Sequence, residues 1–165
     1  MKLVIYDLSE SEFNKLDIKF DGYKVFSALK KYAPCQGCFN CWLKSPGRCH
    51  IKDGLENIGE IIGKSEEIII ISQNYYGGYS PSVKNILDRS IATSLPFFTY
   101  RKGKLHHTLR YKNSSKLKVY LYGDFTDFER ETAAELVKVN GVNMGCKDTS
   151  FLAVNDYLLL REVLQ

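Results

Sequence analysis

The sequence contains no long hydrophobic segment. Its longest aliphatic run, Ile68 to Ile71, is far too short to cross a bilayer. The first residues, Met1 to Tyr6, lead directly into acidic residues and offer neither an extended apolar stretch nor a small-residue cleavage site. We therefore expect a cytoplasmic protein that does not insert into a membrane, in which cysteines are more often free thiols or ligands than disulfides.

The sequence also lacks a strong excess of charge of one sign. Its 23 lysine and arginine residues are interspersed with 19 acidic residues, and the net charge of +4 is too small to indicate a nucleic-acid partner. The densest basic segment, Tyr100 to Lys118, is predicted to be a solvated loop; the alternative is a rim that attracts an anionic ligand such as a dinucleotide phosphate. Proline is scarce, and no repeat or low-complexity linker divides the chain, so we expect one domain over residues 1–165.

Cysteine, in contrast, is concentrated in one place. Four of the 5 cysteines lie close together in the sequence: Cys35, Cys38, Cys41 and Cys49. Thiolates separated by two residues suit an iron–sulfur cluster, whereas structural zinc sites usually take two ligand pairs from separate parts of a chain. A [4Fe-4S] cluster is therefore one hypothesis. Redox-active thiols, or thiols buried as small hydrophobes in a packed loop, are the alternatives.

Short apolar runs rich in β-forming residues alternate with stretches of helical periodicity. The predicted strands are Leu3–Tyr6, Tyr23–Leu29, Glu67–Ser72, Leu117–Tyr122 and Phe151–Val154. The predicted helices are Asp53–Gly63, Ser80–Leu95, Thr126–Val139 and Asn155–Gln165, with only the short segment Glu10–Leu16 between the first two strands. This alternation predicts an α/β fold with a doubly wound parallel sheet.

In a sheet of this kind, ligands bind beyond the carboxyl ends of the strands. Those ends are followed by the loops after Tyr6, Leu29, Ile71 and Tyr122. Because the cysteine loop follows the second predicted strand, we expect it to lie at this ligand-binding edge, beside the other loops.

Three segments resemble the flavodoxin-like family of NAD(P)H-dependent flavin reductases, and especially its iron–sulfur flavoprotein branch. Pro34 to Asp53 is similar to the compact cysteine motif of that branch, and Ile71 to Arg89 is similar to the flavin loop and the helix behind it. The third segment is Tyr122 to Asp124, after the fourth predicted strand. The resemblance implies a flavodoxin-like sheet of five strands in the order 2-1-3-4-5, with a reduced first helix.

The same resemblance implies a cofactor, FMN, with NAD(P)H as the reductant. The positions that would bind FMN are Ser9, Ser11, Gln73, Asn74, Tyr75, Tyr76, Gly77, Gly78, Tyr122, Gly123 and Asp124. The four clustered cysteines are the candidate metal ligands. Glycines allow the backbone to approach a planar ligand, and tyrosines supply a face on which it can stack. No side chain is expected to be catalytic, because the flavin would carry the redox chemistry.

The first loop departs from the pattern of this family. FMN-binding members have small polar residues and glycine there, whereas Asp7 to Phe13 contains three carboxylates and no glycine. A phosphate dianion near these carboxylates would be repelled, although Ser9 and Ser11 can donate hydrogen bonds. One hypothesis is an FMN-dependent oxidoreductase or electron-transfer flavoprotein with an unusual phosphate contact. The other is a flavodoxin-fold binding or sensor module whose flavin site is degenerate and whose cysteine loop is structural.

The expected partners follow from the favoured hypothesis. They are flavin and nicotinamide molecules, with an electron-transfer protein as a further candidate and a homodimer as a candidate assembly. The adjacent His106 and His107 are predicted to be surface residues, and Cys146 a buried or loop thiol.

Overall fold

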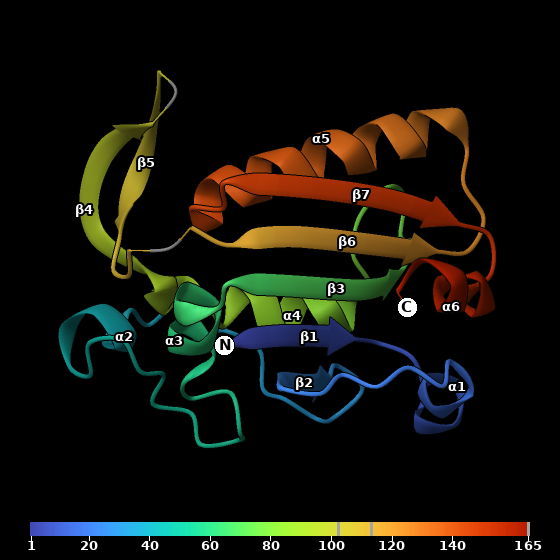
Figure 1. Cartoon of the computed structure of the whole chain (residues 1–165). Helices are drawn as coiled ribbons and strands as arrows, with labels where there is room; N and C mark the ends of the chain where they lie inside the picture. The colour runs from blue at the N-terminus through green and yellow to red at the C-terminus, as the bar shows by residue number, and fades with distance from the viewer. Residues whose placement is uncertain (102, 113, 165) are drawn as a thin grey trace.

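The computed structural model describes residues 1–101, 103–112 and 114–164 and contains the expected parallel sheet. Its five strands are β1 (Lys2–Tyr6), β2 (Tyr23–Ser27), β3 (Glu67–Gln73), β6 (Lys116–Tyr122) and β7 (Asp148–Val154). They are hydrogen-bonded in the order β2-β1-β3-β6-β7, with every neighbouring pair parallel. Numbered among themselves, these strands follow the order 2-1-3-4-5, so the predicted flavodoxin-like fold is confirmed (Figure 1).

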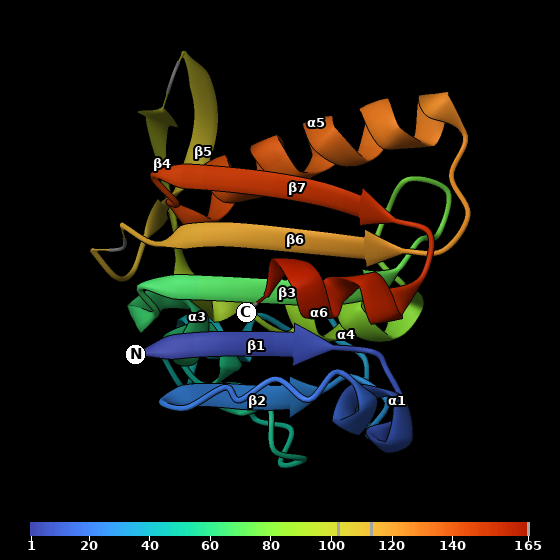
Figure 2. The same ribbon diagram turned by 45° about the vertical axis from the view of Figure 1, so that its right-hand side comes forward.

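Helices cover the two faces of the sheet unequally. The helices are α1 (Glu10–Lys15), α2 (Asn40–Leu43), α3 (Ile58–Lys64), α4 (Pro81–Asp88), α5 (Asp127–Met144) and α6 (Leu160–Val163), with 3-10 turns at Ile91–Thr93 and Tyr157–Leu159. On one face α3, α4 and α5 enclose the larger core, whose centre is formed by residues such as Ile70 and Leu121. Figure 2 shows α6 in front of the sheet and α3 and α4 behind it. Because α1 and α6 are short, the second face has only a thin cover.

The predicted reduction of the first helix is confirmed. Helix α1 has 6 residues and begins at Glu10, and the side chain of the preceding Ser9 caps it together with that of Glu12. Aromatic rings supply part of the missing cover: Phe13 stacks on Tyr6 with centroids 3.9 Å apart, and Phe20 follows at 5.7 Å from Phe13. Stacked rings therefore shield part of the sheet face that a longer helix would otherwise bury.

Two expectations near the middle of the chain are wrong. Helix α4 ends at Asp88 rather than Leu95, and residues predicted as a solvated loop form an antiparallel hairpin, β4 (Ser94–Arg101) and β5 (Lys104–Leu109). The run of β-forming residues from Phe97 to Tyr100 favours a strand, and Gly103, at a φ of 74°, allows the turn. The lysines and arginines around this run obscure the strand pattern in the sequence. Lys102 of the basic segment and Gln165 of the predicted last helix lie outside the described residues.

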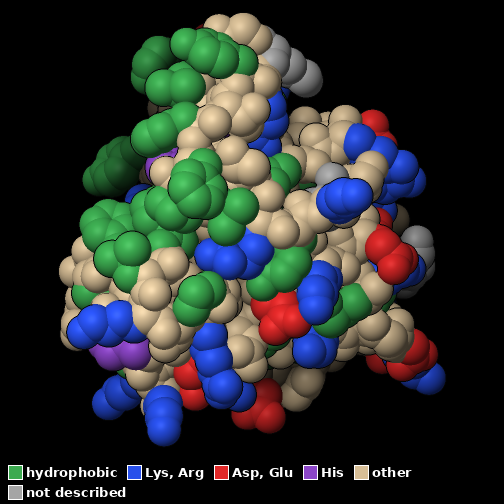
Figure 3. Space-filling model, turned by 90° about the vertical axis from the view of Figure 1, so that its left-hand side faces the viewer, with side chains coloured by type: hydrophobic (Ala, Val, Ile, Leu, Met, Phe, Trp, Pro, Cys, Tyr) green, Lys and Arg blue, Asp and Glu red, His purple; other side chains and the backbone are tan. Residues whose placement is uncertain are grey.

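The hairpin stands away from the main sheet, at the edge where the strands begin (Figure 1). One of its faces is apolar and open to solvent, with exposed side chains at Phe98, Tyr100 and Leu105. Figure 3 shows hydrophobic side chains gathered on this side of the molecule. None of the helices in the described residues is both long enough and apolar enough to cross a membrane.

Candidate functional site

Loops from the carboxyl ends of β3 and β6 are joined by Asn74. Its backbone N–H donates to the carbonyl oxygen of Tyr122 at 2.8 Å, and its side-chain amide donates to that of Asp124 at 2.7 Å. Gly123, between these two acceptors, has a φ of 114° and donates its N–H to Val154 at 3.0 Å. The structure therefore brings the predicted residues of both loops together at one edge of the sheet.

The loop after β3 is a tight turn that displays two tyrosines. Tyr75 and Gly78 exchange backbone hydrogen bonds of 3.0 and 2.9 Å, and Tyr76 and Gly77 between them have φ values of 53° and 79°. The side-chain oxygen of Asn74 accepts a hydrogen bond from the Gly77 N–H at 2.9 Å. Tyr75 is 45% exposed and Tyr76 is 88% exposed. A fixed turn with exposed aromatic rings offers a stacking surface to a planar ligand.

Gly77 also fixes the position of this turn against α5. A Cβ atom at this residue would lie 2.7 Å from the carbonyl oxygen of Glu129 and 2.9 Å from the Cβ of Thr132. Both the backbone conformation and the close approach therefore require glycine.

Asp7 occupies the point between β1 and β3 where this strand order creates its ligand-binding crevice. Its side chain is buried and accepts hydrogen bonds from the Ser72 hydroxyl at 3.0 Å, the Gln73 N–H at 2.9 Å and the Tyr122 hydroxyl at 2.9 Å. Burial, and then the Asp7 charge, raise the pKa of Tyr122 well above its usual range, so this hydroxyl stays a donor. The chain thus supplies its own anion at the switch point.

At the amino end of α1, a carboxylate of the chain likewise accepts the hydrogen bonds of nearby donors. The Glu12 carboxylate accepts hydrogen bonds from the Ser9 N–H at 2.8 Å and the Ser9 hydroxyl at 2.6 Å, while the Ser9 hydroxyl oxygen accepts one from the Glu12 N–H at 3.3 Å. These bonds from Ser9 lower the pKa of Glu12. Ser11 is exposed and contacts only the Ser9 hydroxyl, at 3.1 Å, among the hydrogen bonds of the described residues.

These contacts fit one part of a flavin nucleotide and not another. The turn with Tyr75 and Tyr76 suits a planar ring system. A phosphate at the switch point fits poorly, because the donors of Ser72, Gln73 and Ser9 are already bonded to Asp7 or Glu12, whose charges would repel it. Ser9 is therefore poorly placed as a phosphate ligand.

The cysteine loop lies at the opposite edge of the sheet, which contradicts the expected position. Figure 1 places α2, within this loop, at the same end as the N-terminus and the hairpin, whereas α1 lies at the other end. The indole N–H of Trp42 donates to the carbonyl oxygen of Ile91, beyond the end of α4, at 3.3 Å. Helix α4 begins directly after the tyrosine turn and has 8 residues, so about 12 Å of helix separates the two sites. The order of elements shows which strand a loop follows, but not where a long loop runs.

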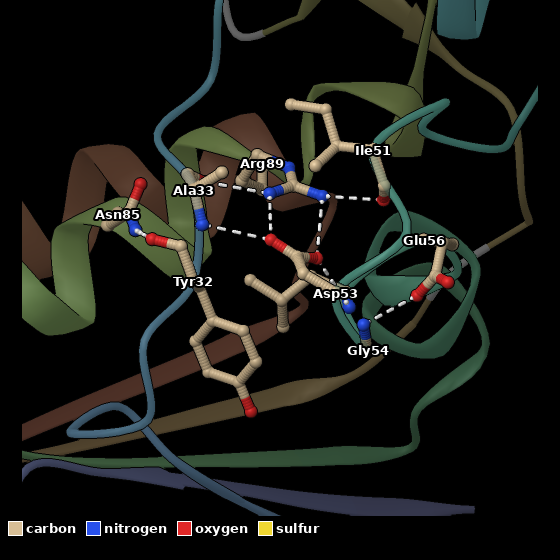
Figure 4. A network of polar contacts seen from close by, with 9 residues as sticks. Tyr32, Ala33, Ile51, Asp53, Gly54, Glu56, Asn85 and Arg89 are labelled. Atoms are coloured by element: carbon tan, nitrogen blue, oxygen red, sulfur yellow. Dashed lines mark hydrogen bonds and ion pairs between the residues drawn. The ribbon is translucent and has the colours of Figure 1, made fainter.

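A buried ion pair clamps both ends of the cysteine loop (Figure 4). Arg89 donates to the two carboxylate oxygens of Asp53 at 2.8 and 3.0 Å, and also to the carbonyl oxygens of Ala33 at 2.7 Å and Ile51 at 3.2 Å. Asp53 in turn accepts from the Ala33 N–H at 2.9 Å. The hydrogen bonds from Arg89 lower the pKa of Asp53. The residues just before and just after the loop are thereby held together.

The four thiols enclose one small space. Together with Arg89 and His50, these thiols line a cavity of about 30 Å³; they belong to Cys35, Cys38, Cys41 and Cys49. Burial, followed by the nearby Cys49, raises the pKa of the Cys41 thiol, whereas Cys35 and Cys38 are exposed. Across the described ranges, no three Cys, His, Asp or Glu side chains converge closely enough to hold a metal ion. The Nε atom of Arg89 is buried beside this cavity and has no hydrogen-bond partner in the part of the chain that the structure describes.

Comparison with known families decides the relationship of this chain. The model of the NADPH-dependent FMN reductase family matches residues 10–109, which is more than half of the sequence. The chain belongs to this family. An iron–sulfur flavoprotein of Archaeoglobus fulgidus is 33% identical over 76 residues, covering 46% of this chain and 38% of that protein. An iron–sulfur flavoprotein of Methanocaldococcus jannaschii is 38% identical over 63 residues, covering 38% of this chain and 32% of that protein. The chain thus spans about a third of the length of these curated relatives.

Solved structures with the same fold include an azoreductase and a quinone oxidoreductase. An FMN-dependent NADH-azoreductase of Bacillus anthracis, solved with FMN, superposes with a TM-score of 0.56 at 13% identity, covering 99% of this chain and 92% of that one. An NAD(P)H:quinone oxidoreductase of Methanothermobacter marburgensis superposes with a TM-score of 0.58 at 14% identity, covering 99% and 93%. At these identities the likeness establishes the fold of this FMN reductase family member.

Arg89 and Asp53 were not among the predicted site residues. One signal was present: Arg89 follows Ile86 by three positions and Val83 by six, so it continues the buried stripe of α4. A charged side chain on such a stripe requires a buried partner.

Proposed function

We propose that this chain is a flavin-dependent redox protein that holds the flavin by its ring system at the tyrosine turn. The observation that carries the proposal is the fixed, exposed pair Tyr75 and Tyr76 in a loop that the family match includes. Asn74 and Gly78 supply the polar edge of the same loop. When bound, the flavin accepts a hydride from NAD(P)H and passes electrons to an acceptor.

The closed switch point determines the preferred form of the ligand. Since Asp7 and Glu12 occupy the donors that a phosphate would need, the phosphate of FMN lies away from them and gains little from the protein. Riboflavin and FMN are therefore expected to bind with dissociation constants within a factor of about three of each other, because no charge-assisted bond distinguishes them.

Fluorescence titration with each flavin tests this proposal. Replacing an exposed aromatic platform, Tyr76→Ala, should weaken both ligands at least about tenfold, given the usual contribution of ring stacking. Tyr100→Ala is the matched control, because Tyr100 is similarly exposed, at 76% compared with 88%, but lies on the hairpin. Equal losses in both variants would contradict the proposed location.

Asp7→Asn tests the role of the internal anion. The substitution removes the repulsive charge at the switch point, so the affinity for FMN should increase relative to that for riboflavin. Thermal unfolding of the same variant checks that it is folded. A ratio of the two affinities that does not change would show that the phosphate never approaches Asp7.

A second proposal concerns the cysteine loop. Four thiols line one cavity beside a buried guanidinium with a free N–H, and thiolates with a nearby donor suit an iron–sulfur cluster. Binding would require the exposed Cys35 and Cys38 to move inward. Iron and acid-labile sulfide analysis of anaerobically prepared protein tests it, with Cys38→Ser as the variant that should lose both. Native protein without iron and sulfide after anaerobic reconstitution would indicate a structural loop.

The alternative is a flavodoxin-fold binding or sensor module. It is favoured by the occupied donors at Asp7 and Glu12. Absence of binding of both FMN and riboflavin at 100-fold molar excess would select this alternative over the flavin-dependent one.

A further inference from the structure

The inner face of the β4–β5 hairpin borders a second cavity, far from the tyrosine turn. It has a volume of about 210 Å³ and lies between the hairpin, α5 and the beginning of β7. The hairpin contributes Arg101, Lys104 and His106, which follow the alternation of its strands: Phe98 and Tyr100 point to the opposite, exposed face. One hairpin therefore separates an apolar outer face from a cationic inner face.

Arg101 is electrically uncompensated in this position. Its Nη2 donates to the carbonyl oxygen of His107 at 3.1 Å, but Nε and Nη1 are buried and have no hydrogen-bond partner within the described residues. Burial lowers the pKa of Arg101, and no acidic group opposes this effect. A buried guanidinium without an anion is costly, so native structures normally supply one.

The surrounding charges do not supply that anion. Three further cations, Lys104, Lys138 and Lys147, line the cavity, and its one acidic side chain, Glu135, is paired with Lys138 at 3.2 Å. His106 is held at the same cavity, because its Nδ1 donates to the side-chain oxygen of Asn143 at 3.0 Å. Cationic groups from three segments of the chain thus face one space.

We propose that this cavity binds the phosphate group of a small phosphorylated molecule, with Arg101 as the principal ligand. Two observations carry the proposal: the buried N–H groups of Arg101 that have no partner among the described residues, and the excess of positive charge around them. A doubly charged phosphate would accept hydrogen bonds from these donors and balance the positive charge, because guanidinium and ammonium groups form strong charge-assisted hydrogen bonds with its oxygens. The flexible stem of Arg101 turns its N–H groups toward the bound anion. The cavity lies at the edge of the sheet where the strands begin, so it is separate from the proposed flavin site.

Inorganic phosphate is the probe. The thermal unfolding midpoint of the complete chain is measured against phosphate concentration at constant ionic strength set with sodium chloride, and binding is followed by ³¹P line broadening. We expect the midpoint to increase with phosphate, by about 5 to 10 °C at a hundredfold excess over the dissociation constant. Succinate is the comparison anion and should have a smaller effect.

Arg101→Gln identifies the site. This variant should lose at least about tenfold in phosphate affinity, yet be as stable as the native chain or more so without phosphate, because it removes an unpaired buried charge. If Arg101 were only structural, the variant would lose stability and keep its affinity for phosphate. Arg161→Gln is the matched control, since Arg161 is an exposed arginine paired with Asp17 at 3.2 Å and should leave phosphate binding unchanged.

Three results would overturn the proposal. They are a native midpoint that phosphate raises no more than sodium chloride does, a phosphate effect that persists in Arg101→Gln, and a response to succinate without one to phosphate. If Arg101→Gln does not fold, the exposed pair Lys104→Gln and Lys147→Gln replaces it, and that double variant should weaken phosphate binding several-fold. An unchanged affinity in the double variant would equally contradict the proposal.

Discussion

Removing the carboxylate of Asp53 should be one of the most damaging single charge changes in this protein. Arg89 has a side chain that is 0% exposed, and Asp53 is only 15% exposed. In Asp53→Asn the shape is nearly conserved, but the new amide N–H groups face the N–H groups of Arg89, and a buried positive charge loses its partner. Breaking a buried pair from one side leaves an uncompensated charge.

The magnitude follows from this burial. Loss of one partner of a fully buried pair costs about 3–5 kcal/mol, and the partial exposure of Asp53 favours the lower end, about 3 kcal/mol. In a chain of this length, each kcal/mol shifts the midpoint of thermal unfolding by about 2–4 °C. We therefore expect Asp53→Asn to unfold about 6–12 °C below the native chain. Because Asp53 and Arg89 hold both ends of the cysteine loop, the exposed cysteines should also react faster with a thiol reagent.

The pH dependence gives an independent check. Hydrogen bonds from Arg89 lower the folded-state pKa of Asp53 below its unfolded value, which is about 3.9. The ionised carboxylate therefore stabilises the fold at pH values above about 4, and this contribution is lost as the pH falls through the lower folded-state pKa. The difference in unfolding free energy between native and variant proteins should be constant from pH 7 to pH 5 and should shrink in more acidic solution.

Asp88→Asn is the matched control for this prediction. Asp88 is the residue before Arg89 and forms an ion pair with Lys84 at 2.7 Å, but its side chain is 50% exposed. An exposed pair of this kind contributes little, so the control should unfold within about 2 °C of the native chain. Equal midpoints for Asp53→Asn and Asp88→Asn in urea or thermal unfolding would refute the reasoning from burial.

Three further changes test the packing around the same sheet. Gly77→Ala should lower stability and flavin binding, because its Cβ would lie 2.7 Å from a backbone oxygen of α5. Gly103→Ala is the control, because Gly103 has a similar φ of 74° but open space around it. Equal losses of stability in the two variants would show that backbone strain, and not the clash, is responsible. Thr126→Ala should cost about 1 kcal/mol in urea unfolding by removing the cap of α5, and an unchanged transition would show that the cap contributes nothing. Ile70→Ala should cost about 2–5 kcal/mol through the cavity it leaves in the core, and a cost below about 1 kcal/mol would show that the surrounding side chains close it.

The sheet could be predicted because its central strands, β1, β3 and β6, are largely buried on both faces. Four consecutive isoleucines from Ile68 to Ile71, which are all buried, leave little alternative to a central parallel strand. The hairpin was missed for the opposite reason. Its strands are not part of the main sheet and are not buried on both faces. Lysine and arginine at positions such as Arg101 and Lys104 also interrupt the apolar alternation.

The candidate site was predictable in composition but not in arrangement. The loop with Tyr75 and Tyr76 could be found because a tyrosine–glycine turn directly follows a strand, and a turn of that size has few conformations. The cysteine loop could not be placed, since its path depends on the pair between Asp53 and Arg89, which lie 36 positions apart in the sequence. Long-range pairing of this kind leaves no local periodicity to detect.

Two groups of buried hydrogen-bond donors lie at opposite edges of the sheet. The donors of one group are bonded to a carboxylate of the chain, whereas those of the other have no such acceptor. At the switch point, N–H and O–H donors converge, and Asp7 accepts from all of them, so an external anion would have to displace a carboxylate that is already bonded. Beneath the hairpin, donors of Arg101 converge with lysines, but the single nearby carboxylate is already bound to another cation. Both places carry basic or donor groups that a scan of charge along the sequence would treat alike. The difference lies in whether the fold brings an acceptor to them, and this difference is the basis for proposing that phosphate binds at the second place rather than the first.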